Sequence, residues 1–233
     1  MYYIPLEKLI LMLIPIVVVW VFYKKWTGRF SNIFTATLRM TVQLLLIGYA
    51  LVYIFTTQSL TIGIAIVLFM VAISSWITLG NIKDQSFREY RNIFIAILIG
   101  GSFNLALVIG LILNVTPFYA PRFLIPLAGM IYANAMNAVS LSAERFEKEI
   151  ERETYLDARA AALTTAIIPQ INAFLAVGLV SLPGMMTGQI LSGIDPIVTV
   201  RYQIMVMAMV FGSAGMSVII YLSLKSRQFS NKV

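Results

Sequence analysis

The sequence predicts an all-α polytopic membrane protein with seven transmembrane helices, its N-terminus outside and its C-terminus cytoplasmic. Of the 233 residues, 60% are hydrophobic and only 12% are charged, whereas a soluble domain carries about 25% charged residues. The apolar residues form uninterrupted runs of about 20, which is the length a helix needs to cross about 30 Å of hydrocarbon. Lysine and arginine gather at alternate ends of these runs, as the positive-inside rule requires.

The runs can be followed in order along the chain. The first ends at Lys24 and Lys25, and a cleaved signal peptide would instead carry its charge before the apolar run. The third ends in a rather polar stretch, residues 74–81, and the fifth leads into a long charged segment. Within one transmembrane domain covering residues 1–233, the predicted spans are residues 6–23, 34–55, 60–80, 92–113, 122–143, 164–184 and 197–223.

The residue inventory excludes several function classes. The chain has no cysteine and no histidine, so disulfides, thiolate or zinc sites and histidine acid–base chemistry are excluded. It also lacks the GxxxxGK[ST] loop through which P-loop proteins bind ATP. The net charge of +7 is explained by the basic ends of the spans and does not indicate nucleic-acid binding. We therefore expect no catalytic residues and no cofactor bound by this chain.

The segment after the fifth span changes from apolar to charged within what reads as one helix. Glycine and proline are absent between Gly129 and Pro169, so we expect the helix to continue through residues 144–160 into the cytoplasm. At 100° per residue, the basic side chains fall on one face and the acidic ones on an adjacent face. Phe146 and Ile150 lie roughly opposite the basic face.

Three interpretations of this charged segment stay open. It could be a solvated connection, a docking element for a cytoplasmic partner, or a helix whose basic face meets anionic lipid headgroups. Docking is favoured because the segment is longer than a connection between adjacent spans needs to be and because its charges are sorted by sign. The candidate docking residues are Glu144, Arg145, Glu147, Lys148, Glu151 and Arg152.

Five blocks of sequence carry a resemblance to a known family. They are MIYANAMNAVSL (residues 130–141), ERF (144–146), IPQIN (168–172), VGLVSLPGMMTGQ (177–189) and RYQI (201–204). Together they closely resemble the FetB-type permeases, which are membrane subunits of ABC transporters linked to iron export. The same family includes the plant ALS-type aluminium-tolerance proteins. Arg39 and Gln43 resemble the family's early Arg…Gln pair.

The resemblance implies a permease that forms a homodimer in the inner (plasma) membrane and pairs with a separate cytoplasmic ATPase. ATP and Mg would bind that ATPase, and the charged segment would be the element that couples the two. The cargo would be iron, another metal ion or a metal complex. A non-metal cargo such as a nucleotide sugar or lipid is the alternative within this class. A secondary transporter is less favoured because no acidic residue lies centrally in any span.

Polar residues inside the predicted spans are the candidates for a transport pathway or for dimer contacts. Such groups are costly in lipid and are usually placed for a reason, although amides and small residues also serve close helix packing. Arg39 could also snorkel to the nearby interface. A Pro-Gly pair at the end of the sixth span predicts a broken helix or re-entrant turn. The candidates are Arg39, Gln43, Asn134, Asn137, Ser140, Gln170, Asn172, Pro183, Gly184 and Gln189.

The sequence does not identify a metal site. Met185 and Met186 are weak candidates, because methionine commonly fills gaps in apolar packing and thioethers suit Cu(I) better than iron. Carboxylates are nearly absent from the spans. If a metal is the cargo, it must therefore pass through amides and carbonyls or travel as a complex.

Overall fold

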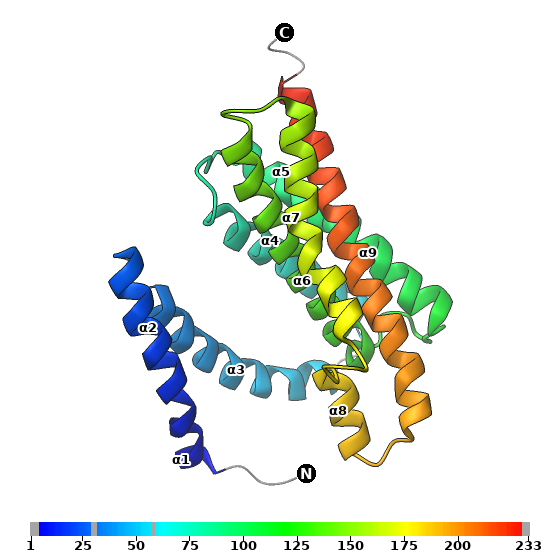
Figure 1. Ribbon diagram of the computed structural model, residues 1–233. Coiled ribbons are helices and arrows are strands. Elements are labelled where there is room, and N and C mark those ends of the chain that lie inside the picture. Colours follow the sequence, from blue (N-terminus) through cyan, green and yellow to red (C-terminus); the bar gives the residue numbers. More distant parts are fainter. Residues whose placement is uncertain (1–4, 29–31, 57–58, 230–233) are drawn as a thin grey trace. The chain divides into compact units, whose positions relative to one another are not determined.

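The computed structural model describes residues 5–28, 32–56 and 59–229. They belong to two compact units, residues 1–57 and residues 58–233, and each unit is described by itself. Every named element in the described ranges is a helix, as predicted, and the only β-type pairing there is an isolated bridge between Val177 and Ser181 (Figure 1).

The first unit consists of apolar helices. The short helix α1 (Leu6–Leu9) continues through a 3-10 turn, η1 (Ile10–Met12), into α2 (Leu13–Thr27), and α3 (Asn32–Thr56) follows. Gly28 ends α2 with a left-handed φ of 70°, the conformation that helix C-termini reserve for glycine. No residue of α2 is buried, so its apolar side chains are available to lipid or to another chain.

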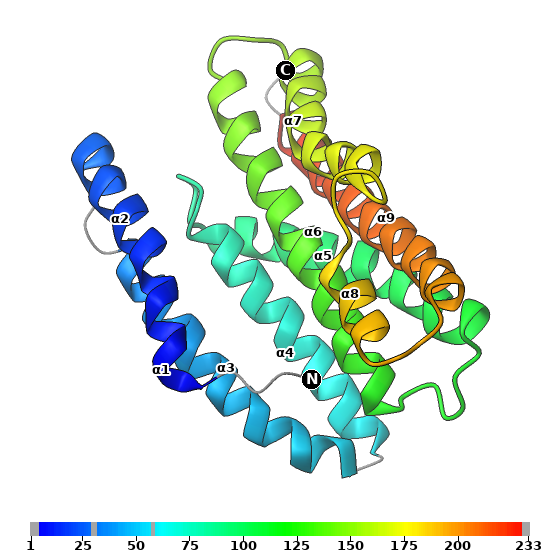
Figure 2. The same cartoon turned by 60° about the horizontal axis from the view of Figure 1, so that its bottom comes forward.

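The second unit is a bundle in which α6 and α9 are the central helices (Figures 1 and 2). Helix α6 packs against α4, α5, α7 and α9, and α9 also contacts α5, α7 and α8. The helices are α4 (Leu60–Leu79), α5 (Phe87–Ala106) with a π-helical turn η2 (Leu107–Ile112), α6 (Pro121–Glu149), α7 (Tyr155–Ala176), α8 (Gly184–Leu191) and α9 (Pro196–Phe229).

Small residues allow α5 to approach its neighbours closely. A Cβ added at Gly100 would lie 2.7 Å from the backbone nitrogen of Ser217 on α9. A Cβ at Gly101 would lie 2.8 Å from Cδ1 of Tyr132 on α6. Helices in membranes commonly associate through small residues that let their backbones approach closely, because the hydrophobic effect does not drive helix association within lipid.

Six helices of the described residues are long and apolar enough to cross a membrane: Glu7–Thr27, Ile33–Thr56, Leu60–Leu79, Phe87–Ile112, Pro121–Glu149 and Pro196–Ser226. Helix α7 is not among them, since Asp157, Arg159, Gln170 and Asn172 lower its hydropathy. The count of seven and the orientation therefore stay predictions. The predicted sixth span, residues 164–184, is wrong at its end, because α7 stops at Ala176 and Gly178 turns with φ 80°.

The expectation of one continuous helix through residues 144–160 is also wrong. Helix α6 ends at Glu149 and α7 begins at Tyr155, with a turn between them. Thr154 caps α7, because its hydroxyl oxygen accepts a hydrogen bond from the backbone N–H of Asp157 at 3.3 Å. A side-chain cap of this kind starts a new helix without any glycine or proline to end the previous one.

Candidate functional site

Several helix ends of the second unit meet at one end of the bundle, which we call the charged end. It comprises the α4–α5 loop (residues 80–86), the first turn of α5, the last turns of α6 and α9, and the α6–α7 turn. In Figure 1 the α6–α7 turn and the end of α9 lie together near the label C. Tyr155 joins two of these elements, since its hydroxyl donates to the backbone carbonyl of Leu222 at 2.8 Å.

Two of the predicted docking carboxylates bind the α4–α5 loop. The backbone N–H groups of Lys83 and Asp84 donate to the two carboxylate oxygens of Glu147, at 2.9 and 3.2 Å. The Lys83 ammonium forms an ion pair with Glu151 at 2.9 Å. Hydrogen bonds to a charged acceptor are stronger than neutral ones. Glu147, on the last turn of α6, and Glu151, in the turn after it, therefore attach this part of the chain to the loop between α4 and α5.

The ion pair shifts the pKa values of both partners. The hydrogen bond and charge of Glu151 raise the pKa of Lys83, and those of Lys83 lower the pKa of Glu151. For Asp84, burial raises the pKa, but hydrogen bonds from Ser86 and the nearby positive charges outweigh it, so the carboxyl pKa is lowered. The opposite charge within hydrogen-bond reach is the cause for the Lys83–Glu151 pair.

The remaining charges of this segment are less sorted than predicted. On α6, Lys148 pairs with Glu144 and Arg145 pairs with Glu149, both at i,i+4 spacing. Arg152 lies in the turn after the helix and is exposed. The prediction of separate basic and acidic faces assumed one unbroken helix. The chain instead forms two helices, α6 and α7, and Thr154 caps the second. Phe146 is buried, as an apolar face predicts, and packs edge-on against Tyr155.

The charged end also contains a buried ion pair that was not predicted from the sequence. The side chains of Glu89 on α5 and Lys225 on α9 are 0% and 6% exposed, and their charged atoms lie 2.8 Å apart. The Tyr221 hydroxyl donates to the other oxygen of Glu89. Ser86-x-x-Glu89 reads as a capping box, but Asp84 accepts the hydrogen bond from the Ser86 N–H instead. The Glu89 carboxylate therefore does not bond to the Ser86 N–H and lies buried beside Lys225 and Tyr221.

Next to the charged end, a cavity of about 520 Å³ lies between α4, α6 and α7. Four of the predicted pathway or dimer positions line it, namely Asn134, Asn137, Ser140 and Gln170. The lining includes Asn81, Asn134, Asn137, Ser140, Pro169 and Gln170. Ser140 precedes Glu144 by one helical turn, and Asn81 lies in the loop that Glu147 holds. We call this space the amide cavity.

The polar groups of the amide cavity are partly tied to one another. The Gln170 amide N–H donates to the Asn134 side-chain oxygen at 3.4 Å, and Asn134 donates to the Met130 carbonyl at 2.8 Å. The Ser140 hydroxyl donates to the Thr78 hydroxyl at 3.2 Å. Asn137 is exposed. The cavity thus presents neutral oxygen and nitrogen groups, with no charged side chain in its lining.

The other predicted pathway positions lie elsewhere. Arg39 and Gln43 are exposed, one turn apart on α3 of the first unit. Asn172 is exposed on α7 and does not line the amide cavity. Pro183 directly precedes α8, which holds Gly184, Met185, Met186 and Gln189. The predicted helix break is present, but it begins at Val177. Among the described residues, no group of three or more His, Cys, Asp and Glu side chains could hold a metal ion.

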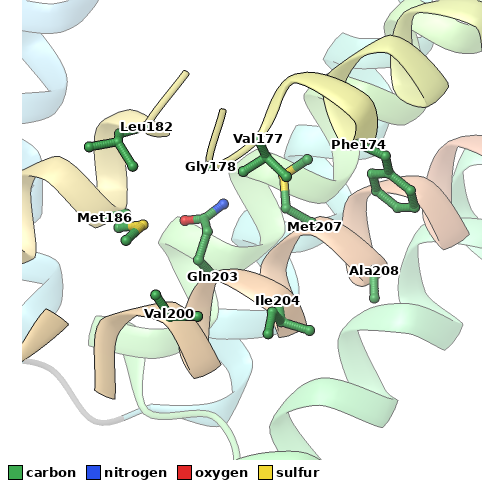
Figure 3. Close-up of a pocket in the computed structure, with 10 residues that line it drawn as sticks. All are labelled: Phe174, Val177, Gly178, Leu182, Met186, Val200, Gln203, Ile204, Met207 and Ala208. Atoms are coloured by element: carbon green, nitrogen blue, oxygen red, sulfur yellow. The ribbon is translucent and has the colours of Figure 1, made fainter. Parts of the chain in front are cut away.

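A second space, of about 470 Å³, lies between the end of α7, α8 and the first turns of α9. Figure 3 shows its ten lining residues, with the Gln203 amide directed between Met186 and Val177. We call it the Gln203 pocket. Gln203 belongs to the RYQI block but was not among the predicted pathway residues, because only the fold places it beside α8.

Comparisons with known proteins identify the family of this chain. The profile of the "Uncharacterised protein family (UPF0014)" matches residues 6–156 and 151–230. The chain belongs to the UPF0014 family. It is 34% identical to the "Probable iron export permease protein FetB" of Escherichia coli K12, an alignment that covers 97% of this chain and 92% of that relative. No solved structure matches the present chain.

Plant members of UPF0014 are similar to this chain as well. "Protein ALUMINUM SENSITIVE 3" of Arabidopsis thaliana is 32% identical over 77% of this chain and 70% of its own length. "UPF0014 membrane protein STAR2" of rice is 31% identical over 83% of this chain and 72% of its own length. The resemblance read from the five sequence blocks is confirmed, and this chain is a multi-pass membrane protein of a permease family.

Proposed function

We propose that this chain is the permease subunit of an ABC-type exporter for iron, another metal ion or a metal complex. A separate cytoplasmic ATPase supplies the energy, and two copies of the permease form the transmembrane assembly in the plasma or inner membrane. The observation that carries the proposal is the 34% identity, over nearly the whole chain, to a relative named as an iron export permease. In this arrangement the charged end faces the cytoplasm.

The amide cavity suits such a cargo. Hard cations prefer oxygen ligands, and Asn134, Asn137 and Ser140 of α6 with Gln170 of α7 supply neutral oxygens to the lining. Without a carboxylate in the lining, an ion or complex is held weakly. Weak binding at several successive groups favours passage, because the cargo must leave as well as enter.

The charged end offers a route from ATP hydrolysis to this cavity. Glu144, Arg145 and Lys148 at the end of α6 and Arg152 in the turn after it are exposed and would bind the ATPase. Glu147 and Glu151 bind the α4–α5 loop, and Asn81 of that loop lines the cavity. A displacement of the α6 end by the ATPase would therefore move the loop and alter the cavity wall. ATP binding and hydrolysis would thus shift the permease between two access states.

The test is metal transport by the purified permease–ATPase complex in liposomes. Iron(II), other divalent metals and an iron chelate are titrated while ATP hydrolysis and metal movement across the bilayer are measured. The proposal expects one metal species to stimulate hydrolysis and to move in parallel. A complex whose hydrolysis responds to no metal would overturn the metal cargo, and failure of any ATPase to co-purify with the permease would overturn the ABC class.

A matched pair of variants tests the amide cavity in the same assay. Gln170→Leu removes an amide from the cavity lining, whereas Asn172→Leu removes an exposed amide two residues away on the same helix. Transport should fall in the first variant and stay near normal in the second. Equal transport rates in both variants would show that the amide cavity is not part of the transport pathway.

A further inference from the structure

The Gln203 pocket is a second, partly open space that shares no lining residue with the amide cavity. Its walls come from the end of α7, the turn after it, α8 and α9 (Figure 3). Phe174, Val177, Leu182, Val200 and Ile204 make the lining apolar, and no charged side chain belongs to it. Its volume of about 470 Å³ is within the range of small-molecule sites.

One side-chain oxygen at this pocket lacks a hydrogen-bond partner. Gln203 is 5% exposed, and its side-chain oxygen, Oε1, has no hydrogen-bond partner. Figure 3 shows its amide pointing into the space between the α8 residue Met186 and the α7–α8 turn residue Val177. A buried acceptor left unpaired is costly, so native structures usually satisfy it with a protein group, water or ligand.

The lining restricts what can occupy the site. A charged molecule would lose its hydration without gaining a counter-charge. A metal ion would find one amide and the thioethers of Met186 and Met207, a set too small and too soft for a hard cation. A neutral molecule with a mainly apolar body would contact the apolar walls, and a single hydrogen-bond donor on it would pair with Oε1 of Gln203.

We propose that the Gln203 pocket binds a neutral, largely apolar molecule whose hydroxyl or amide N–H donates to Gln203. Both a bilayer lipid with a free hydroxyl and a small lipophilic alcohol have this chemistry. The site is separate from the proposed metal pathway and does not depend on it. Met186 and Met207 line the same space, so their methyl groups report directly on its occupant.

The probe is 4-butylphenol, with its methyl ether, 4-butylanisole, as the matched compound that lacks the donor. The full chain, labelled with 13C at the methionine methyl groups, is placed in phosphatidylcholine nanodiscs and titrated with each compound. The phenol should shift the Met186 and Met207 signals saturably, with little change at Met136, which lines the amide cavity instead. The ether should bind about fivefold more weakly, which corresponds to one net hydrogen bond.

Two variants separate the amide from general packing. Gln203→Leu should bind phenol and ether equally. Thr199→Val removes a buried hydroxyl one turn earlier on α9, outside the pocket lining, and should keep the preference for the phenol. Should Gln203→Leu fail to fold, the comparison of phenol and ether on the unaltered protein still decides the question.

Three outcomes would overturn the proposal. The first is equal affinity for phenol and ether in the unaltered protein. The second is a set of shifts that never saturates, which indicates partition into the bilayer. The third is a pocket closed to both compounds because a second copy of the chain covers it. Competition by dioleoylglycerol added to the nanodisc would support a lipid as the occupant, whereas saturable phenol binding without such competition would support a small lipophilic molecule.

Discussion

At the scale of single residues, the Glu89–Lys225 pair is the most consequential interaction at the charged end. Both side chains are almost completely buried, and the Tyr221 hydroxyl satisfies the second carboxylate oxygen. Removing two charges from water costs free energy that only close pairing and additional hydrogen bonds offset. The pair therefore fixes the start of α5 against the end of α9, while adding little to stability compared with an apolar pair of the same shape.

The first prediction concerns the loss of one member of this pair. Lys225→Met leaves the Glu89 carboxylate buried without a counter-charge, and this should lower the free energy of unfolding by about 3 kcal/mol or more. Lys148→Met, in an exposed pair, should change it by less than about 0.5 kcal/mol. Thermal unfolding in detergent measures both. The double variant Glu89→Gln, Lys225→Met should recover part of the loss, and a double variant as unstable as the single one would contradict this account.

The second prediction uses the reactivity of the Lys83 amine. Glu151 raises the pKa of Lys83, so less of the amine is deprotonated at a given alkaline pH. Glu151→Gln should therefore speed acetylation of Lys83, with the midpoint of its pH profile falling toward 10.5, the ordinary lysine value. Mass spectrometry of the labelled peptides measures the rate, and Lys148, which pairs with Glu144, is the internal control. An unchanged Lys83 profile would mean that the ion pair does not persist in solution.

The same pair has a defined pH window. Because the pKa of Glu151 is lowered, its contribution is present above the ordinary carboxyl pKa and is lost as the pH falls through the lowered value. Because the pKa of Lys83 is raised, its contribution is present below the ordinary amine pKa and is lost as the pH rises through the raised value. The attachment of the α4–α5 loop through this pair is thus insensitive to pH near neutrality.

At the scale of helices, the sequence predicted where apolar segments lie better than where helices end. Runs of apolar residues report burial in lipid or protein, and each predicted span overlaps an observed helix. Helix ends depend on single hydrogen bonds. The Thr154 cap starts α7 at Tyr155, although no glycine or proline separates α7 from α6. The Thr-x-x-Asp spacing was readable in the sequence as a capping signal.

The third prediction tests this cap. Thr154→Ala removes the acceptor for the Asp157 N–H and should destabilise the start of α7 by about 1 kcal/mol. Thr154→Ser keeps a hydroxyl and should have little effect. Hydrogen exchange of the amides of residues 155–158 measures the change locally. Faster exchange in the serine variant than in the alanine variant would show that the hydroxyl is not the stabilising group.

The fourth prediction concerns the contact between α5 and α9. Gly100→Ala places a methyl group within 3 Å of the Ser217 backbone, and such overpacking costs about 1–3 kcal/mol. Gly129→Ala is the matched control, because a Cβ there meets nothing within 4 Å and alanine favours the helix. Thermal unfolding should show the first variant destabilised and the second equal or more stable. The reverse order would mean that α5 and α9 are less closely packed than described.

At the scale of the whole molecule, the sequence located the residues of the amide cavity but not their neighbours. Asn134, Asn137 and Ser140 recur at helical spacing on one helix, so a shared polar strip was predictable. Asn81, Gln203 and the Glu89–Lys225 pair were not selected, because the residues that surround them are distant in sequence and only packing brings them together. The same packing makes the α4–α5 loop a physical link between the charged end and the amide cavity.

The fifth prediction concerns this link. Glu147→Gln weakens the hydrogen bonds to the backbone of Lys83 and Asp84, because a neutral amide is a poorer acceptor than a carboxylate. In the proposed permease–ATPase complex, the metal moved per ATP hydrolysed should fall, while the ATPase subunit still binds. Arg152→Ala, in the exposed turn, should instead weaken ATPase binding and leave the transport yield of the bound complexes unchanged. Measuring both quantities in the same liposomes separates docking from transmission, and a Glu147→Gln complex with normal yield would show that the loop does not carry the motion.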